Sequence, residues 1–182
     1  MIADQRLVRL SKYLSKHLRH QPERLGLVLL PGGWVAVDDL LAACAGNHVP
    51  ISRAELDEVV ARNDKQRFAF DASGTMIRAN QGHSIEVDLG LDPAEPPPVL
   101  YHGTGERSAG AIMRSGLLPM RRQHVHLSIG IETATRVGAR HGRPVVFAVD
   151  AANMHRSGHR FYRAENGVWL IDHVPPEYLQ RL

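Results

Sequence analysis

The segment KHLRH at residues 16–20 gathers two cationic side chains and two histidines within five residues. Guanidinium and ammonium groups bind phosphate through charge-assisted hydrogen bonds, and imidazole also exchanges protons near neutral pH. The segment therefore fits half of a phosphate-handling site, although a solvated helix surface would have the same composition. Lys16 continues a basic helix face, whereas Arg19 and His20 come last, directly before a Gln-Pro pair.

Histidines in the second half of the chain occupy positions that predict strands. His102 lies in YHGT, where a strand that ends at a glycine can bring an imidazole and backbone groups against a ligand. His124 and His126 share one strand face, because the side-chain period of a strand is two, and Ser128 follows on that face. A zinc site would need further ligands, and no cysteine or carboxylate cluster follows to complete one. We therefore expect no metal, and each histidine alone also fits a structural role.

Three further polar segments fit either a ligand or an ordinary structural role. Arg140 lies in RHGR and Arg67 in RNDKQR, and both segments follow predicted helices, where basic residues also complement the helix dipole. The segment QGHS at residues 81–84 has no apolar side chain and predicts a polar turn.

Composition limits the class of protein. The 182 residues are 43% hydrophobic, which is enough for a buried core in one or two small domains. Cys44, the single cysteine, lies in the apolar stretch LLAACAG, so we predict a core residue, and no intramolecular disulfide is possible. The N-terminal residues contain no long apolar segment and no cleavage-site pattern, which predicts a cytoplasmic protein without a signal peptide or membrane span.

The positive charge is unevenly distributed. All 11 cationic side chains in residues 93–182 are arginines. The planar guanidinium suits bidentate phosphate contacts better than an ammonium group does. Base-composition bias in a GC-rich genome would produce the same excess, so both explanations stay open.

The first half of the chain predicts three helices and a β-hairpin. A leucine stripe opposite the basic face makes residues 5–20 an amphipathic helix. Residues 25–37 predict a strand, a turn and a second strand. Asp38 is a plausible cap of the next helix, and Ser52 with Glu55 forms a capping box for the third. The alternating segment RFAFDASGTMIRAN predicts the hairpin, and the whole pattern resembles a winged helix.

A proline-rich segment at residues 93–98 predicts a stiff linker between two lobes, residues 1–92 and 99–182. The second lobe predicts an α+β arrangement in which the helical stretches SAGAIMRSG and ETATRVGARHG separate the strands VLYHGT, HVHLS, PVVFAVD and GVWLIDHV. The Rossmann and P-loop phosphate-binding motifs do not occur.

Eight segments between about residues 6 and 179 are together similar to the NAD-dependent RNA 2′-phosphotransferases: LSKYLSKHLRHQP, GGWVAVDDLL, NDKQRFAF, IRANQGHS, YHGT, GLLPMRRQHVHLS, VGARHGRPVVFAVD and NGVWLIDHVPPEYL. This resemblance implies an α+β fold in which an N-terminal winged-helix RNA-binding lobe is joined to a C-terminal ADP-ribosyltransferase-like lobe with a split β-sheet.

The resemblance also implies a reaction. NAD would be the co-substrate, and no metal would be required. The 2′-phosphate of an RNA would attack the nicotinamide ribose, expel nicotinamide and form a 2′-phospho-ADP-ribosylated RNA. The ribose 2″-hydroxyl would then attack phosphorus, releasing the RNA and ADP-ribose 1″,2″-cyclic phosphate. The expected partners are RNA that carries a 2′-phosphate and NAD, with no membrane, and we expect a monomer.

The resemblance assigns roles to individual positions. The family's catalytic positions match Arg19, His20, Arg67 and Arg140. For the last of these, Arg136 and Arg143 remain alternatives, and His20 is either a general acid or a phosphate ligand. The NAD-binding positions match His102, Gly103, Thr104, His126, Ser128 and Val168. Contacts to RNA are expected from Arg9, Lys12, Lys16, Gln81, His83 and Ser84.

Val168 stands where protein-modifying relatives carry a catalytic glutamate. A phosphate acceptor is already anionic, so a carboxylate beside it would repel it, and positive charge is what the site needs. Two other functions stay open. One is an ADP-ribosyltransferase that caps terminal phosphates of RNA or DNA, and the other is a non-catalytic RNA-binding module.

Overall fold

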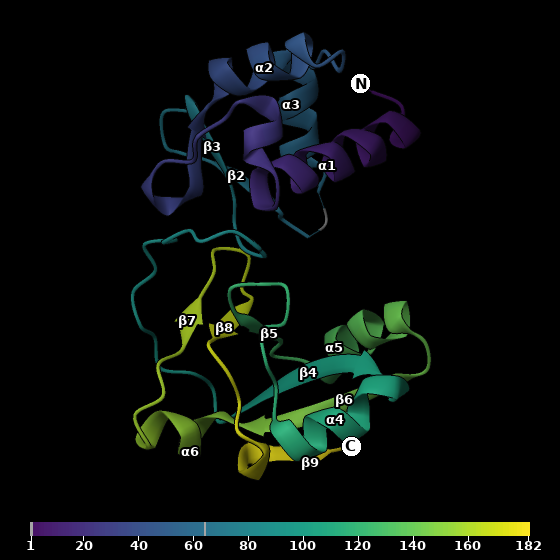
Figure 1. The fold of residues 1–182 in the computed structure, drawn as a ribbon, viewed down its shortest axis with the longest axis vertical. Coiled ribbons are helices and arrows are strands. Elements are labelled where there is room, and N and C mark those ends of the chain that lie inside the picture. The colour runs from purple at the N-terminus through teal and green to yellow at the C-terminus, as the bar shows by residue number, and fades with distance from the viewer. Residues whose placement is uncertain (1, 64) are drawn as a thin grey trace. The chain divides into compact units, whose positions relative to one another are not determined.

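The computed structural model describes residues 2–63 and 65–182, and the chain divides into two compact units, Met1–Gly90 and Leu91–Leu182. Each unit combines helices with small antiparallel sheets (Figure 1), so the α+β fold class is confirmed. In the part of the chain that the structure describes, no helix is both long and apolar enough to cross a membrane.

The N-terminal unit packs three helices against a three-stranded sheet of strand order β1-β3-β2. Its α-helices and strands are α1 (Asp4–Arg19), β1 (Trp34–Ala36), α2 (Val37–Gly46), α3 (Arg53–Ala61), β2 (Phe68–Phe70) and β3 (Met76–Ala79). Two 3₁₀ turns, η1 (Pro22–Leu25) and η2 (Pro31–Gly33), connect α1 to β1. The leucine stripe of α1 forms part of the core, because Leu10, Leu14 and Leu18 are buried against the other elements.

Local signals explain two of these elements. The capping box of α3 is confirmed: Ser52 Oγ accepts a hydrogen bond from the Glu55 N–H at 3.2 Å, and the Glu55 carboxylate accepts one from the Ser52 N–H at 2.9 Å. The hairpin is confirmed as well. Strands β2 and β3 pair in antiparallel register with Phe70 opposite Ile77, and Gly74 provides the left-handed backbone (φ 71°) of the turn.

Two expectations for the N-terminal unit are wrong. The stretch before Pro31 is not a strand. It contributes only a single bridge from Leu30 to Trp34, because the 3₁₀ turn η2 brings the chain back at once. Asp38 is not the cap of α2, since the capping residue is Ala36, which has no capping side chain. Asp38 instead lies in the first turn, where a carboxylate complements the positive end of the helix dipole.

The C-terminal unit contains two three-stranded sheets, of order β4-β6-β9 and β5-β8-β7. Its strands are β4 (Val99–Gly105), β5 (Val125–Leu127), β6 (Pro144–Asp150), β7 (Tyr162–Arg163), β8 (Trp169–Ile171) and β9 (Leu179–Arg181). Its α-helices are α4 (Glu106–Ser115), α5 (Ile131–Gly138) and α6 (Ala151–Arg156). The 3₁₀ turns are η3 (Ala139–His141) and η4 (Pro176–Tyr178). The core packs side chains such as Phe161 and Trp169 between these elements.

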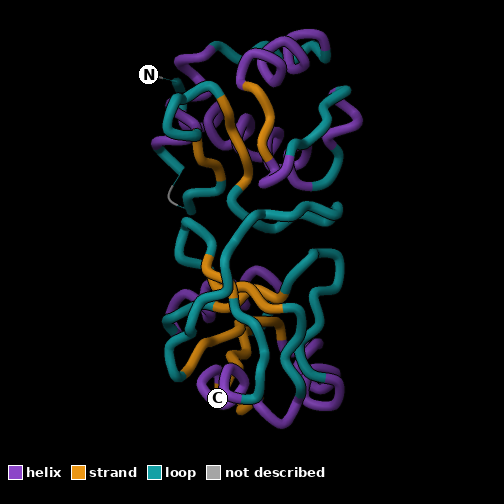
Figure 2. The backbone as a smooth tube through the Cα atoms, turned by 90° about the vertical axis from the view of Figure 1, so that its left-hand side faces the viewer, coloured by secondary structure: helices purple, strands orange, loops and turns teal. Residues whose placement is uncertain are grey.

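The two sheets of this unit meet at the end of β5. Tyr101 and Ser128 exchange two backbone hydrogen bonds of 2.8 Å, which join β4 to the segment that follows β5. Figure 2 shows the extended chain that leads into this unit as a long loop segment. The proline-rich residues 93–98 lie within the C-terminal unit, where the Ala94 N–H donates to the Phe161 carbonyl oxygen at 2.8 Å.

Cys44 is buried in the N-terminal core, as its apolar context predicted. Burial raises the pKa of its thiol to about 11, so the thiolate is scarce at neutral pH and the side chain acts as a small apolar group.

Candidate functional site

Arg19 and His20 lie where α1 ends, and a polar loop holds them there. The Ser84 N–H donates a hydrogen bond of 3.0 Å to the Arg19 carbonyl oxygen, and His20 Nδ1 lies 2.9 Å from Ser84 Oγ. Two residues before Ser84, Gly82 has φ 92°, a conformation that favours glycine and lets the loop turn beside the Arg19 side chain. The polar turn QGHS therefore positions the end of α1.

Arg67 lies beside the same helix end. The Arg19 guanidinium donates to the Arg67 carbonyl oxygen at 3.4 Å, and the Arg67 guanidinium donates to Asn63 Oδ1 at 3.1 Å. The Asn80 N–H donates to the Arg67 carbonyl oxygen at 2.9 Å, which connects this residue to the strand end after β3. The structure thus brings Arg19, His20 and Arg67 together, although 47 positions separate the second residue from the third.

His83 supports this cluster from the interior of the unit. Its side chain is only 1% exposed, and neither ring nitrogen has a hydrogen-bond partner in the described residues. Burial, and next the nearby cationic side chains of Arg19, His20 and Arg78, lower the pKa of His83 to about 4. His83 is therefore a neutral imidazole, buried next to the cationic side chains at the end of α1. Of the other residues in the loop, Ser84 is exposed and Gln81 is half-buried.

In the C-terminal unit, His102 on β4 is fixed by a backbone contact. Its Nδ1–H donates to the carbonyl oxygen of His126 on β5 at 3.0 Å. This bond places the proton of the neutral ring on Nδ1 and leaves the lone pair on Nε2. Burial lowers the pKa of His102, the hydrogen bond to the His126 carbonyl oxygen partly opposes this, and electrostatic interactions with Arg122 and His141 lower it further. The imidazole is therefore neutral at physiological pH.

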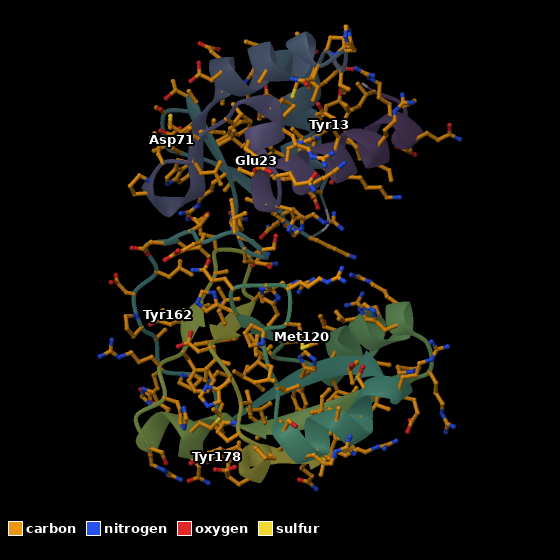
Figure 3. The ribbon with its side chains drawn as sticks, in the orientation of Figure 1. Tyr13, Glu23, Asp71, Met120, Tyr162 and Tyr178 are labelled. Carbon is orange, nitrogen blue, oxygen red and sulfur yellow. The ribbon has the colours of Figure 1, made fainter. Side chains whose placement is uncertain are left out.

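Arg122 is a member of this second cluster that our sequence analysis did not select. Its guanidinium contacts Nδ1 of His126, and burial, followed by repulsion from Arg140, lowers the pKa of Arg122. The turn that precedes Arg122 includes Met120 (labelled in Figure 3), which has φ 56°. The sequence contained a usable signal, because Arg122 precedes His126 by four residues in RRQHVH.

The remaining predicted residues of this unit lie around the cluster. Gly103 packs directly against α5, since a Cβ there would lie 1.7 Å from the Ala134 carbonyl oxygen. This close approach holds α5 and the following turn η3, which carries Arg140, over strand β4. Thr104 is buried in β4, and Val168 is half-buried immediately before β8. Ser128 is joined to β4 through the backbone bonds to Tyr101.

The two alternatives to Arg140 have other contacts. The Arg136 guanidinium donates to Thr133 Oγ1 at 3.2 Å, within α5. Arg143 accepts at its carbonyl oxygen a hydrogen bond of 2.9 Å from the Glu106 N–H, which starts α4. Of the three arginines, Arg140 is the one whose charge acts on Arg122.

His124, the other histidine of the HVH segment, has different neighbours from His126. Its Nε2 lies 3.8 Å from a carboxylate oxygen of Asp172, and its ring lies near that of Tyr162. Residues 2–63 and 65–182 contain no group of three or more His, Cys, Asp or Glu side chains arranged to hold a metal ion.

Comparisons with known proteins agree on one family. Residues 5–173 match the family described as RNA 2′-phosphotransferase, Tpt1/KptA family. A probable RNA 2′-phosphotransferase of Trichormus variabilis is 67% identical over 177 residues, which cover 97% of each chain. The corresponding protein of Nostoc punctiforme is 62% identical over the full length of both chains, and that of Streptomyces coelicolor is 62% identical over 97% of this chain and 96% of its own. The chain therefore belongs to the RNA 2′-phosphotransferase, Tpt1/KptA family.

Proposed function

We propose that this protein removes an internal 2′-phosphate from RNA by transferring it to NAD. The observation that carries the proposal is the cluster of Arg19, His20 and Arg67, whose cationic groups come from distant parts of the sequence and meet at one helix end. Such a group binds a phosphate by charge-assisted hydrogen bonds. Membership in the RNA 2′-phosphotransferase family supports the choice of substrate.

In this proposal the N-terminal unit is a winged-helix lobe that binds the phosphate. Its three helices and its sheet, with the β2–β3 hairpin, are consistent with that fold. Arg19 and Arg67 stabilise the negative charge that develops on the phosphate oxygens when phosphorus is attacked. Ser84 engages Nδ1 of His20, so we assign Nε2 of His20 to the phosphate.

The C-terminal unit is, in this proposal, an ADP-ribosyltransferase-like lobe that binds NAD. Its donor set fits NAD. The neutral His102 offers a lone pair to a ribose hydroxyl, and the guanidinium groups of Arg122 and Arg140 match the charge of the pyrophosphate. His126 lies on β5, and Ser128, in the segment that follows β5, pairs with Tyr101 of β4.

Two displacement steps complete the reaction. First, an oxygen of the 2′-phosphate forms a bond to C1″ of the nicotinamide ribose, and the glycosidic bond breaks with its electron pair leaving on nicotinamide. Second, the ribose 2″-oxygen forms a bond to phosphorus while the bond from phosphorus to the RNA 2′-oxygen breaks. The proton of the 2″-hydroxyl leaves, and the RNA 2′-oxygen gains a proton. His20 is the group that we assign to protonating that oxygen.

The test is an incubation of the protein with NAD and an oligonucleotide that carries one internal 2′-phosphate, in the presence of EDTA. We expect loss of the 2′-phosphate, with one nicotinamide and one ADP-ribose 1″,2″-cyclic phosphate formed for each phosphate removed. Survival of the 2′-phosphate would contradict the proposal. An oligonucleotide with only a 5′-phosphate, run in parallel, shows whether the protein instead adds ADP-ribose to terminal phosphates. Absence of nicotinamide release in both reactions would indicate a binding protein.

A further inference from the structure

We call Arg19, His20 and Arg67 the phosphate cluster. A groove in the N-terminal unit extends from this cluster along one face of α1. Its volume is about 560 Å³, and it is bounded by α1, the end of α3 and the segment after α3. Arg19, His20 and Arg67 line one part of it, and Leu7 and Val8 line the part near the start of α1. Helices α1 and α3 lie side by side, as Figure 1 shows. We call this feature the α1–α3 groove.

Among the described residues, every charged side chain that lines the α1–α3 groove is cationic. Besides the phosphate cluster, its cationic residues are Lys12, Lys16, Arg62 and Lys65, and among the described residues no carboxylate lines it. Lys12 and Lys16 are exposed, and neither forms an ion pair within residues 2–63 or 65–182. Their charge is therefore available to an anionic partner.

The nearby carboxylates are already paired with arginines outside the phosphate cluster. Arg6 contacts Glu55 at 2.5 Å, and Arg62 contacts Asp4 at 2.6 Å and Glu58 at 3.2 Å. The Arg6–Glu55 and Arg62–Asp4 pairs join α1 to the α3 region, and they engage these carboxylates away from Lys12 and Lys16. The positive charges of Lys12 and Lys16 are therefore not compensated by these carboxylates.

The groove also has an apolar surface. Val8 is 50% exposed, and the half-buried Leu7 lines the groove beside it, whereas Val59 forms its buried floor. A cationic track next to an exposed and a half-buried apolar side chain suits a single strand of nucleic acid, whose phosphates and unpaired base faces are both accessible. A duplex offers phosphates but keeps its base faces stacked inside.

We propose that the α1–α3 groove binds the single-stranded RNA that flanks the 2′-phosphate, with Lys12 and Lys16 contacting its backbone phosphates and Val8, beside the half-buried Leu7, contacting its bases. This inference rests on the proposed function for the place of the 2′-phosphate, beside Arg19 and His20. From Val8 to Arg19 the helix spans about 16 Å at 1.5 Å per residue. A stacked strand advances about 3.4 Å per nucleotide, so the groove accommodates roughly five nucleotides, the one that carries the 2′-phosphate and about four beyond it.

The structure supplies a matched control on the same helix. Arg9 is also an exposed cation of α1, but it does not line the groove. Our sequence analysis grouped Arg9 with Lys12 and Lys16 as RNA-binding, and the groove separates them. Substitution of each by alanine, the strongest helix former, preserves α1 and removes one positive charge.

The experiment measures binding and turnover with oligonucleotides that carry one 2′-phosphate and have from one to six additional nucleotides on either side. For the wild-type protein we expect affinity to rise with length on one side and to level off near four nucleotides. The double variant Lys12→Ala/Lys16→Ala should lose most of this gain, by roughly 10-fold, and should keep its activity on the shortest substrate. Arg9→Ala should behave as the wild type does.

Salt dependence gives a second readout. Each phosphate contact to a single strand contributes a slope of about −0.7 to the dependence of log K on log salt, so removing two contacts should reduce the slope by about 1.4. An equal length gain in the wild type and the double variant would overturn the inference, as would an equal gain with duplex flanks. Competition by an acidic peptide without any length gain for RNA would assign the groove to a protein partner and also overturn it.

Failure of the proposed function would be distinguishable from failure of this inference. If the wild-type protein removes no 2′-phosphate, the same variants are compared in binding to unphosphorylated oligonucleotides of graded length. A selective loss in Lys12→Ala/Lys16→Ala then still supports the groove, and no difference from Arg9→Ala contradicts it.

Discussion

The cluster in the N-terminal unit and the cluster in the C-terminal unit use histidine in opposite ways. His20 lies exposed at a helix end among guanidinium groups and is held by a serine hydroxyl. His102 lies within a sheet, donates a hydrogen bond from Nδ1–H to a backbone carbonyl oxygen and has a lowered pKa. The first arrangement presents charge to an anion, and the second presents a neutral ring in a fixed orientation. The two units therefore present chemically different histidines, which is the division of labour that the proposed reaction needs.

The largest expected effect tests the phosphate cluster. Arg67→Ala removes a cation from the site where charge develops, and loss of one such donor typically costs about 10²- to 10³-fold in rate. We expect the second step to slow most, so that 2′-phospho-ADP-ribosylated RNA accumulates in single-turnover reactions with NAD. Arg9→Ala is the charge-matched control. An intermediate no more abundant than in the wild type would mean that Arg67 does not act on the second step.

A stability measurement tests the neutral histidine behind that cluster. Because the folded-state pKa of His83 is about 4, below its ordinary value of 6.5, the folded protein binds this proton less tightly than the unfolded chain does. The associated stability is present above pH 6.5 and is lost as the pH falls toward 4. Each pKa unit corresponds to 1.36 kcal/mol, so the free energy of unfolding falls by up to about 3 kcal/mol once the pH is below the folded-state pKa of His83.

His83→Gln is the variant that isolates this effect, because glutamine does not titrate. Denaturant unfolding at several pH values should show a shallower decrease in the free energy of unfolding between pH 6.5 and pH 4 for the variant than for the wild type. Parallel curves for the two proteins would show that His83 does not keep a lowered pKa in solution.

The C-terminal cluster is tested by comparing three arginines. We expect Arg122→Ala to reduce kcat/KM by about 10- to 100-fold, the value of one charge-assisted hydrogen bond. Arg140→Ala should have a smaller effect, because the charge of Arg140 acts on Arg122, whereas Arg122 itself contacts His126. Arg136→Ala should resemble the wild type, since that guanidinium contacts Thr133 within α5. The readout is nicotinamide release at varied NAD concentration, and a larger loss for Arg136→Ala than for Arg122→Ala would reverse our assignment.

The smallest effect concerns an ion pair that is remote from both clusters. The Arg6 guanidinium holds the pKa of the Glu55 carboxyl at about 2, chiefly through their side-chain hydrogen bond. Arg6→Ala should lower the free energy of unfolding only slightly, because solvent screens the pair, and should leave turnover unchanged. The pair contributes only when the carboxylate is ionised, so its effect should vanish as the pH falls through 2. A large loss of activity would show that this pair does more than join α1 to α3.

Features that depend on nearby residues could be read from the sequence. The amphipathic helix α1, the capping box at Ser52 and the hairpin at Gly74 each follow from a pattern within about a dozen residues. The two incorrect predictions also concern local signals, at Leu30 and Asp38. In both places several backbone conformations suit the same residues, and packing of the chain selects one of them.

The sequence by itself determined the residue types that can bind phosphate, their helical spacing on α1 and the segments that identify the family. Only the tertiary structure decided which of them meet. Arg67 approaches Arg19 through its backbone carbonyl, Arg122 turns back onto His126, and the lysines of α1 share a groove that Arg9 does not reach. Burial of His83 was equally invisible, because its sequence neighbours are polar. The physical reason is that burial and long-range contact depend on how distant segments pack, which no short stretch of sequence specifies.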